Sequence, residues 1–506
     1  MQETQRAVKT YENYIDGEWV AASSGETYET RDPGRTGEVV GRYPLSTAED
    51  VDRAVEAAYR AFQEWRDVPA PERMGYVHGL IEIWRRRRDE LAAAVTLEMG
   101  KPILEARTEV DRGVGEMQFT AGEALRAGGE TLPSGRRDLL AYTVREPIGV
   151  VAAVTPWNFP VLSPIRKVIP ALVHGCTVVL KPASLTPLTS VIIVEMLKEA
   201  GVPAGVVNLV IGRGGEVGDA LVTHPRVNGI TFTGSTEVGL GIYEKAAPSN
   251  KKVQLEMGGK NGCVVAKSKA PKEAAAQIVA AAYQTSGQRC TAISRVIVLE
   301  EQREELEAAL VEEAEKLKVG YGLDDGTTMG PLSSRNQLQR SVHYVDLAQK
   351  DGARVILGGR EATGEAFDQG HYYEPTILTD VKPGTPAALD EIFGPVLVVT
   401  PVEDFAEALE VHNEVQYGLT SSIFTDDMDL ARAFVRGSEA GMVHVNNGTV
   451  SEGHMPFGGG KQSGMGAYGI GATNKGFFTN LKVVYHQHGE GSRPPIRQLL
   501  EEEDPA

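Results

Sequence analysis

Cysteine is scarce in this sequence. The three cysteines, Cys176, Cys263 and Cys290, form an odd set without C-x-x-C spacing, so we expect neither a disulfide framework nor a metal site. Cys176 and Cys263 lie in apolar strand contexts and are predicted to be inert core residues. Free thiols fit a reducing compartment, and we therefore expect a cytoplasmic protein.

Long apolar runs and excess positive charge are also missing. No stretch approaches the roughly 18 uninterrupted apolar residues of a membrane span, and the polar start of the chain has no signal-peptide core. A formal net charge of −18 argues against a nucleic-acid partner, because such binding needs Lys and Arg to meet phosphates. We expect neither a membrane nor a nucleic acid as partner, although a local positive pocket could still bind an anion.

What the chain does have is length and glycine. Its 506 residues exceed one compact core, so two or three domains are expected, and its 56 glycines indicate many tight turns. From about Arg145, apolar runs alternate with helical segments, which predicts βαβ units and a doubly wound parallel sheet. The expected strands of this sheet are 148–154, 177–180, 206–211, 229–233 and 253–255.

A second α/β block begins after Lys260. A helix is expected at 271–284, and the loop carrying Cys290 follows it. The strands predicted for this block are 261–266, 294–300, 353–357, 396–402, 421–424 and 441–445.

Two helical stretches are predicted before the first sheet. Ser46 and Glu49 have capping-box spacing and mark the start of one helix. The other opens at Pro71 and ends near Gly100. It contains four consecutive arginines at 85–88, which we interpret as a solvated helix face or subunit contact rather than a functional basic patch.

Two glycine-rich stretches resemble phosphate loops. The stretch at 212–218 nearly matches G-x-G-x-x-G, but its last glycine falls one place late, so it does not qualify as the dinucleotide fingerprint. Gly234 and Ser235 follow a predicted strand and could open a helix whose free N–H groups face a cofactor. A plain strand–helix turn would have the same sequence.

The stretch Gln288-Arg289-Cys290-Thr291 places a thiol beside a guanidinium. The thiolate is the reactive form of cysteine and neighbouring positive charge stabilises it, so Cys290 is a candidate nucleophile. The alternative is a small buried hydrophobe. Upstream, Glu256 ends an apolar strand and runs into a Gly-Gly turn, where a carboxylate can face a cavity.

Seven motifs follow one another along the chain. They are Thr155-Pro156-Trp157-Asn158-Phe159-Pro160, Leu180-Lys181-Pro182-Ala183-Ser184, Phe232-Thr233-Gly234-Ser235-Thr236, Leu255-Glu256-Met257-Gly258-Gly259-Lys260, Gly287-Gln288-Arg289-Cys290, Glu391-Ile392-Phe393-Gly394-Pro395 and Pro456-Phe457-Gly458-Gly459. Together they resemble the aldehyde dehydrogenase superfamily from about Tyr14 to about Tyr485.

The resemblance and the strand pattern together imply a domain plan. A doubly wound NAD(P)-binding domain is expected at 1–123 and 147–257, and a second α/β domain with the catalytic cysteine at 258–462. A small β oligomerisation arm is expected at 124–146 and 476–487, and a polar C-terminal tail at 488–506. Relatives form homodimers or homotetramers, here through pairing of the arm with strand 479–486 of a neighbouring subunit.

Aldehyde oxidation gives the motif residues their implied roles. By resemblance, Cys290 attacks the aldehyde, the Asn158 amide and the backbone N–H of Cys290 hold the oxyanion, and Glu256 activates water to hydrolyse the acyl thioester. The cofactor, NADP or NAD, is expected to contact Thr155, Pro156, Trp157, Lys181, Ser184, Gly234, Ser235, Glu391 and Phe393.

Two departures from the family pattern bear on the chemistry. Many NAD-preferring relatives carry a glutamate at the position of Ser184, and its carboxylate repels a 2′-phosphate; its replacement favours NADP slightly. Many relatives have Arg-Glu in place of Ala467-Tyr468, so a second carboxylate sometimes proposed to relay protons is absent here.

The implied substrate carries a carboxylate. Arg166 and Ser451 match residues with which semialdehyde dehydrogenases hold a distal acid, and Phe457 is expected to line the same site. The pattern most resembles 2-oxoglutarate semialdehyde (2,5-dioxopentanoate) dehydrogenases. Succinate semialdehyde and neutral aldehydes remain alternatives, and a salt bridge is the alternative role for Arg166. A non-catalytic protein on a retired dehydrogenase fold is disfavoured by the intact Cys290, Glu256, Asn158 and Lys181.

Overall fold

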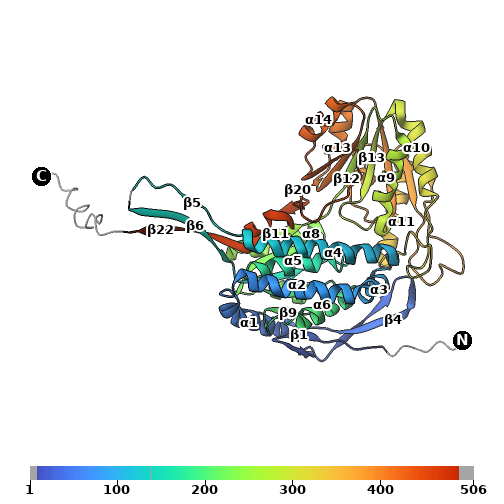
Figure 1. The fold of residues 1–506 in the computed structure, drawn as a ribbon. Coiled ribbons are helices and arrows are strands. Elements are labelled where there is room, and N and C mark those ends of the chain that lie inside the picture. Colours follow the sequence, from blue (N-terminus) through green and yellow to red (C-terminus); the bar gives the residue numbers. More distant parts are fainter. Residues whose placement is uncertain (1–7, 137, 489–506) are drawn as a thin grey trace.

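The computed structural model describes residues 8–136 and 138–488. The polar N-terminal residues 1–6 and all of the predicted C-terminal tail except residue 488 lie outside this range. Figure 1 shows two α/β bodies, one above the other, and a thin β arm that projects away from both. Within the described residues, no helix is both long enough and apolar enough to cross a membrane.

The lower body is built on an eight-stranded sheet of described residues, in the order β2-β1-β9-β8-β7-β10-β11-β21. Its five central strands run parallel, and they are β9, β8, β7, β10 and β11. The strands are β1 (Asn13–Ile15), β2 (Glu18–Val20), β7 (Val150–Val154), β8 (Thr177–Lys181), β9 (Val207–Leu209), β10 (Val227–Thr233), β11 (Lys252–Glu256) and β21 (Gly464–Met465). All five strands predicted for this sheet are present.

Successive residues of β7 pack in different cores on the two faces of this sheet. Val151 and Ala153 pack with α2 (Ala70–Arg86), α4 (Ile103–Glu123), α5 (Leu162–Val173) and α6 (Pro187–Glu199). Val150 and Ala152 pack with α1 (Ala48–Trp65), α7 (Asp219–Thr223) and α8 (Thr236–Ala246). Helices on both faces of a parallel sheet confirm the doubly wound prediction.

The upper body contains a second, seven-stranded sheet of described residues, in which only the edge strand β14 runs antiparallel. Its order is β14 (Arg354–Leu357), β15 (Thr376–Thr379), β16 (Val396–Val402), β13 (Ile293–Leu299), β12 (Asn261–Val265), β18 (Thr420–Phe424) and β19 (Met442–Val445). The six predicted strands are present, and β15 is an addition. The covering helices are α9 (Pro271–Tyr283), α10 (Glu300–Ala314), α11 (Arg335–Lys350), α13 (Phe405–Asn413) and α14 (Met428–Gly437).

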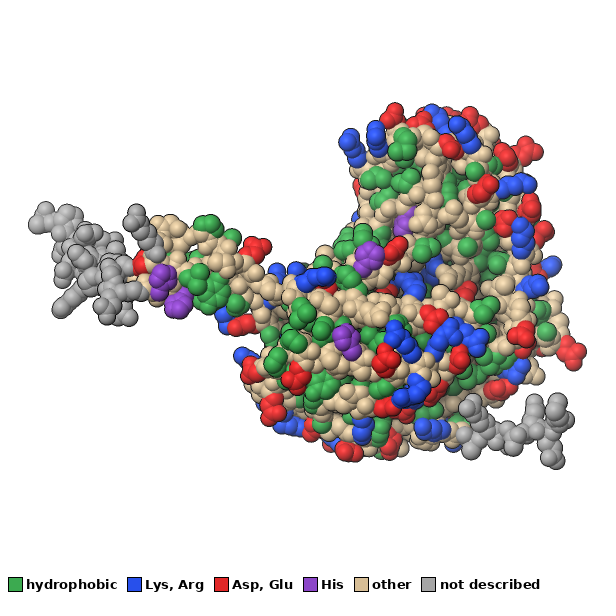
Figure 2. Space-filling view, viewed as in Figure 1, with side chains coloured by type: hydrophobic (Ala, Val, Ile, Leu, Met, Phe, Trp, Pro, Cys, Tyr) green, Lys and Arg blue, Asp and Glu red, His purple; other side chains and the backbone are tan. Residues whose placement is uncertain are grey.

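The arm is a three-stranded antiparallel sheet of β5 (Thr131–Leu132), β6 (Leu139–Pro147) and β22 (Thr479–Gln487). β22 pairs with β6 of its own chain along its full length. The predicted pairing with a neighbouring subunit's C-terminal strand was therefore wrong, because the chain closes that ladder itself. Apolar side chains remain exposed along the arm, as Figure 2 shows, among them Leu132, Leu140, Leu481, Val483 and Tyr485.

Two predictions at the helix ends needed correction. The capping box of α1 uses Thr47 and Asp50 rather than Ser46 and Glu49, since the Ser46 hydroxyl already accepts a hydrogen bond from Asn13. The second helical stretch is divided at Arg87 into α2 and α3 (Arg88–Met99). Each of the four arginines at 85–88 pairs with an acidic side chain of the same chain, and the choice between a solvated helix face and a subunit contact stays a prediction.

The remaining elements are short or lie at the edges. They are β3 (Thr27–Asp32), β4 (Arg35–Pro44), a π-helical turn (Gly214–Gly218), α12 (Pro386–Leu389), β17 (Tyr417–Gly418), β20 (Gly460–Lys461) and α15 (Lys475–Phe478), with 3₁₀ turns at Ala124–Arg126, Ala247–Ser249, Gln284–Gly287 and Gly471–Thr473.

Candidate active site

A pocket lies between the two bodies, where the loops that follow the parallel strands of the first sheet meet the loop that precedes β13 in the second. Cys290, Glu256 and Asn158 all line it. Side chains from α4 and α5 and from the segment around Ser451 complete the wall. Ligand sites beyond the carboxyl ends of parallel strands are the rule for such sheets.

The loop before Cys290 has an unusual backbone. Thr285 and Ser286 have φ angles of 59° and 55°, in the left-handed region that side chains rarely adopt. Gly287 follows with φ 72°, and a Cβ there would lie 2.1 Å from the carbonyl oxygen of Gly394. The Asn261 amide donates to the carbonyl oxygen of Cys290 at 2.7 Å. Cys290, the candidate nucleophile, therefore lies on a tightly fixed loop.

The Cys290 thiol lies in an environment that favours its protonated form. Burial raises its pKa well above the ordinary value, and the Glu256 carboxylate, to which it is hydrogen-bonded, raises it further. Arg289 lowers this pKa, as the sequence suggested, but it is outweighed. Cys176 and Cys263 are fully buried, as predicted, and burial raises the pKa of both thiols.

Glu256 is the last residue of β11, where it pairs with Gly464. Burial raises the pKa of its carboxyl to about 7, against the lowering effects of the Cys290 hydrogen bond and of two nearby cations, Lys167 and Arg166. One carboxylate oxygen, Oε1, is buried without a hydrogen-bond partner among the described residues. A carboxyl group with such a pKa can change protonation state at neutral pH, as a general base must.

Lys167 is a site residue that no sequence motif marked. Its ammonium group donates to Thr233 Oγ1 at 2.8 Å, and burial lowers its pKa to about 7. Lys167 and Glu256 stabilise each other's charged forms.

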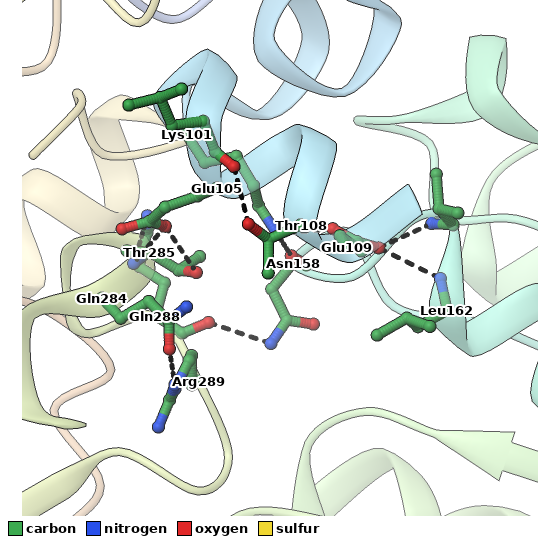
Figure 3. Close-up of polar contacts among 12 residues, drawn as sticks. Lys101, Glu105, Thr108, Glu109, Asn158, Leu162, Gln284, Thr285, Gln288 and Arg289 are labelled. Atoms are coloured by element: carbon green, nitrogen blue, oxygen red, sulfur yellow. Dashed lines mark hydrogen bonds and ion pairs between the residues drawn. The ribbon is translucent and has the colours of Figure 1, made fainter. Parts of the chain in front are cut away.

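Asn158 is held between α4 and the Cys290 loop (Figure 3). Its side-chain amide donates to the carbonyl oxygen of Gln288 at 2.9 Å. The backbone carbonyl oxygen of Asn158 accepts a hydrogen bond from Lys101 at 3.0 Å. Lys101 also forms a buried ion pair with Glu109 at 2.6 Å. Because an amide NH₂ has two N–H bonds, one remains available to a ligand.

Two carboxylates of α4 bind the backbone of both loops. Glu109 accepts hydrogen bonds from the backbone N–H groups of Val161 and Leu162, at 2.9 and 3.0 Å. Glu105 accepts from the backbone N–H of Thr285 at 2.8 Å (Figure 3). α4 thus fixes the loops that carry Asn158 and Cys290 relative to each other.

The residues predicted to bind the adenosine and pyrophosphate follow the strands of the first sheet. Thr155 follows β7 and donates its N–H to the carbonyl oxygen of Lys181, at the end of β8. Burial lowers the pKa of Lys181 to about 8, and its ammonium group donates to the carbonyl oxygen of Pro182. The Ser184 hydroxyl donates to the carbonyl oxygen of Gly212 at 3.0 Å. A buried ammonium whose hydrogen-bond partner among the described residues is a neutral carbonyl suits the hydroxyl- and phosphate-rich half of a dinucleotide.

Gly234 and Ser235 stand where β10 passes into α8. A Cβ on Gly234 would lie 2.4 Å from the ring of Phe232, so only glycine fits. Ser235 is the N-cap of α8. These features fit a close approach of backbone to a phosphate.

The residues predicted near the nicotinamide ribose come together from both bodies. Glu391 accepts from the Gly259 N–H at 2.8 Å, and burial raises its pKa to about 7. The rings of Trp157 and Phe393 meet edge-on with centroids 5.5 Å apart. Pro156 precedes Trp157 in the loop after β7.

The predicted substrate residues lie together in the pocket, but each already has a partner. Arg166 binds both oxygens of Glu116, at 2.8 and 2.6 Å, and stacks over the Phe457 ring at 5.0 Å. The Ser451 hydroxyl accepts from Arg112 at 3.2 Å. Glu116 and Arg112 were not identified from the sequence.

The charged side chains lining the pocket are mainly cationic. They are Arg112, Arg166, Lys167, Arg289 and Glu256. A chain with a formal net charge of −18 thus has a positive pocket around its candidate nucleophile. Such a field favours an anionic ligand.

Comparison with known proteins gives matches over nearly the whole chain. The family model described as "Aldehyde dehydrogenase family" matches residues 19–484. The alpha-ketoglutaric semialdehyde dehydrogenase of Bacillus subtilis (strain 168) is 41% identical over 477 residues, covering 94% of this chain and 98% of that protein.

Solved structures share the fold at similar coverage. Betaine aldehyde dehydrogenase from Staphylococcus aureus, in complex with NAD+, has a TM-score of 0.92 at 33% identity and covers 96% of each chain. A 3,6-anhydro-L-galactose dehydrogenase in complex with NAP has a TM-score of 0.91 at 32% identity, covering 94% of this chain and 99% of that one.

Proposed function

Because this chain belongs to the aldehyde dehydrogenase family, we propose that it oxidises a carboxylate-bearing aldehyde to the carboxylic acid with NAD(P). The observation that carries the substrate class is the positive pocket around Cys290 in an otherwise acidic protein. 2,5-Dioxopentanoate is the preferred candidate, since the Bacillus subtilis relative is named for that semialdehyde.

The chemistry is assigned to three side chains. Cys290, once it has lost its proton, bonds to the aldehyde carbon. The remaining amide N–H of Asn158 and the backbone N–H of Cys290 stabilise the oxyanion that forms. A bound nicotinamide supplies the acceptor for the aldehyde hydride. Glu256 then takes a proton from water, which hydrolyses the thioester on Cys290.

The substrate class is tested by comparing aldehydes of equal chain length. We expect kcat/KM for 2,5-dioxopentanoate to exceed that for pentanal by at least about tenfold, because a charge-assisted hydrogen bond contributes about 1.5–3 kcal/mol. Succinate semialdehyde and butanal form the second pair. The highest value with succinate semialdehyde would favour the alternative substrate, and equal values within each pair would contradict an acid-binding pocket.

Cofactor choice is proposed to depend on Ser184. With no carboxylate at this position, the protein is expected to accept NADP, and we favour NADP slightly over NAD. The Ser184→Glu variant should shift kcat/KM towards NAD by about tenfold or more, since its carboxylate would repel a 2′-phosphate. Ser184→Ala is the matched control, because it removes the hydroxyl without adding charge. A tenfold preference of the unmodified protein for NAD would contradict the proposal.

Assembly into a homodimer or homotetramer is proposed through the arm. Leu481, Val483 and Tyr485 on β22 are 56%, 54% and 70% exposed, and such apolar exposure is typical of a contact surface. We also propose the domain division and the cytoplasmic location that the sequence predicts. Light scattering at micromolar concentration should give at least twice the mass of one chain, and a monomeric mass would refute this.

A further inference from the structure

The charges at one wall of the pocket do not cancel. Arg166 and Glu116 form a two-bonded ion pair, with only 18% and 4% of their side chains exposed. Such a pair neutralises itself and fixes both side chains. Arg112 lies one turn before Glu116 on α4, and its closest approach to that carboxylate is 3.6 Å. Two guanidinium groups therefore share one carboxylate, which leaves one positive charge.

That charge is centred on Arg112. Among the described residues its hydrogen bonds go only to Ser451, to the hydroxyl and the carbonyl oxygen, at 3.2 Å each. Both acceptors are neutral and both contacts are long, so they offset little of the charge. The Arg112 side chain is 36% exposed, twice as much as that of Arg166, and both arginines line the pocket that contains Cys290.

Building on the proposed function, we infer that Arg112, together with Ser451, is the direct ligand of the substrate's distal carboxylate. Arg166 is a positioning residue, which holds Glu116 and packs on Phe457. An aldehyde with one carboxylate at its far end supplies the single negative charge that this wall lacks. The planar guanidinium of Arg112 can meet that carboxylate with two parallel hydrogen bonds.

In this arrangement, substitution of Arg166 does not measure binding of the substrate carboxylate alone. Removing Arg166 leaves the Glu116 carboxylate buried without its bonded partner, and such a charge disturbs its surroundings whatever the substrate. Its loss should therefore lower kcat/KM for charged and neutral aldehydes together. Arg112 can be replaced without that effect, because Arg166 still pairs with Glu116.

The test compares Arg112→Gln with Arg107→Gln on both aldehyde pairs. Arg107 is on the same helix and pairs with Asp89 at the surface. Arg112→Gln should lower kcat/KM for 2,5-dioxopentanoate by about ten- to a hundredfold, mainly through KM, since the carboxylate is bound alike in ground and transition states. Rates with pentanal should change less than about twofold, which also shows that the variant folds. Arg107→Gln should change neither, and Arg112→Lys should recover part of the loss.

The outcomes separate this inference from the function on which it rests. An unmodified protein without preference for semialdehydes overturns both. If that preference exists but survives in Arg112→Gln, or is lost selectively in Arg166→Gln instead, the inference about Arg112 is overturned and the proposed function stands. Equal losses of Arg112→Gln on charged and neutral aldehydes also overturn it.

Discussion

Cys290→Ala is expected to abolish aldehyde oxidation while the protein still folds and binds its cofactor. The thiol lies in the pocket beside Glu256 and is proposed to form the covalent bond to the aldehyde. Loss of that bond should lower the rate at least about a thousandfold, equivalent to more than about 4 kcal/mol in the barrier. The steady-state rate and the dissociation constant of NADP should be measured on the same preparation.

Cys176→Ala is the matched control for this experiment. The Cys176 thiol is fully buried in the core of the first sheet, and burial raises its pKa to about 11. Its replacement should leave the rate per folded molecule unchanged. Turnover in Cys290→Ala above about one part in a thousand would remove Cys290 from its assigned role.

Strands buried on both faces were the most predictable part of this fold. Runs such as Val150–Val154 are almost wholly apolar, because helices cover both faces of the sheet. β15 was missed because its sequence, Thr-Ile-Leu-Thr, is short and half polar. All four of its residues are nonetheless buried. Burial of a hydroxyl depends on neighbours distant in sequence, which a local pattern does not contain.

The start of α1 shows the same dependence on distant residues. Two capping boxes overlap in the sequence, one from Ser46 to Glu49 and the other from Thr47 to Asp50. Asn13, distant in the sequence, binds the Ser46 hydroxyl, and the second box forms. Local spacing alone did not distinguish them.

The candidate site was predictable where its residues lie in motif loops and was missed where they lie on helices. Along α4, Glu105, Glu109, Arg112 and Glu116 recur at intervals of three, four and seven residues, which is the spacing of one helix face. Such charged stripes usually face water. Here all four contact the loops and pocket residues named above, and a charged stripe followed by an active-site motif was the one available signal.

Replacing Glu256 with glutamine is expected to separate the two halves of the reaction. In the first half, the Glu256 carboxylate raises the pKa of the Cys290 thiol. Its neutralisation therefore makes the thiol easier to ionise, and one equivalent of reduced cofactor should still appear rapidly per active site. In the second half, each thioester needs an activated water. Since a general base contributes about 10²–10⁴-fold, steady-state turnover should fall by about that factor.

The pH profile supplies an independent measurement of the same role. Glu256 acts as a base only when ionised, and its pKa is raised to about 7. Steady-state turnover of the unmodified protein should therefore rise with pH through about 7 and level off above it. The Glu256→Gln variant should lose this limb. Lys167→Met keeps the carboxylate but removes a cation that lowers its pKa, so the limb should move to higher pH and persist.

These two measurements decide between a base for deacylation and other roles for Glu256. If the burst amplitude and the steady-state rate of Glu256→Gln fell equally, the residue would act before the thioester forms, at the thiol itself. If the variant kept a pH limb near 7, the ionisation would belong to another group, such as Lys167 or Glu391, whose pKa values also lie at about 7. A preserved burst, slow turnover and a lost limb together are expected only if Glu256 activates the hydrolytic water, because water attack is the step that follows the first release of reduced cofactor.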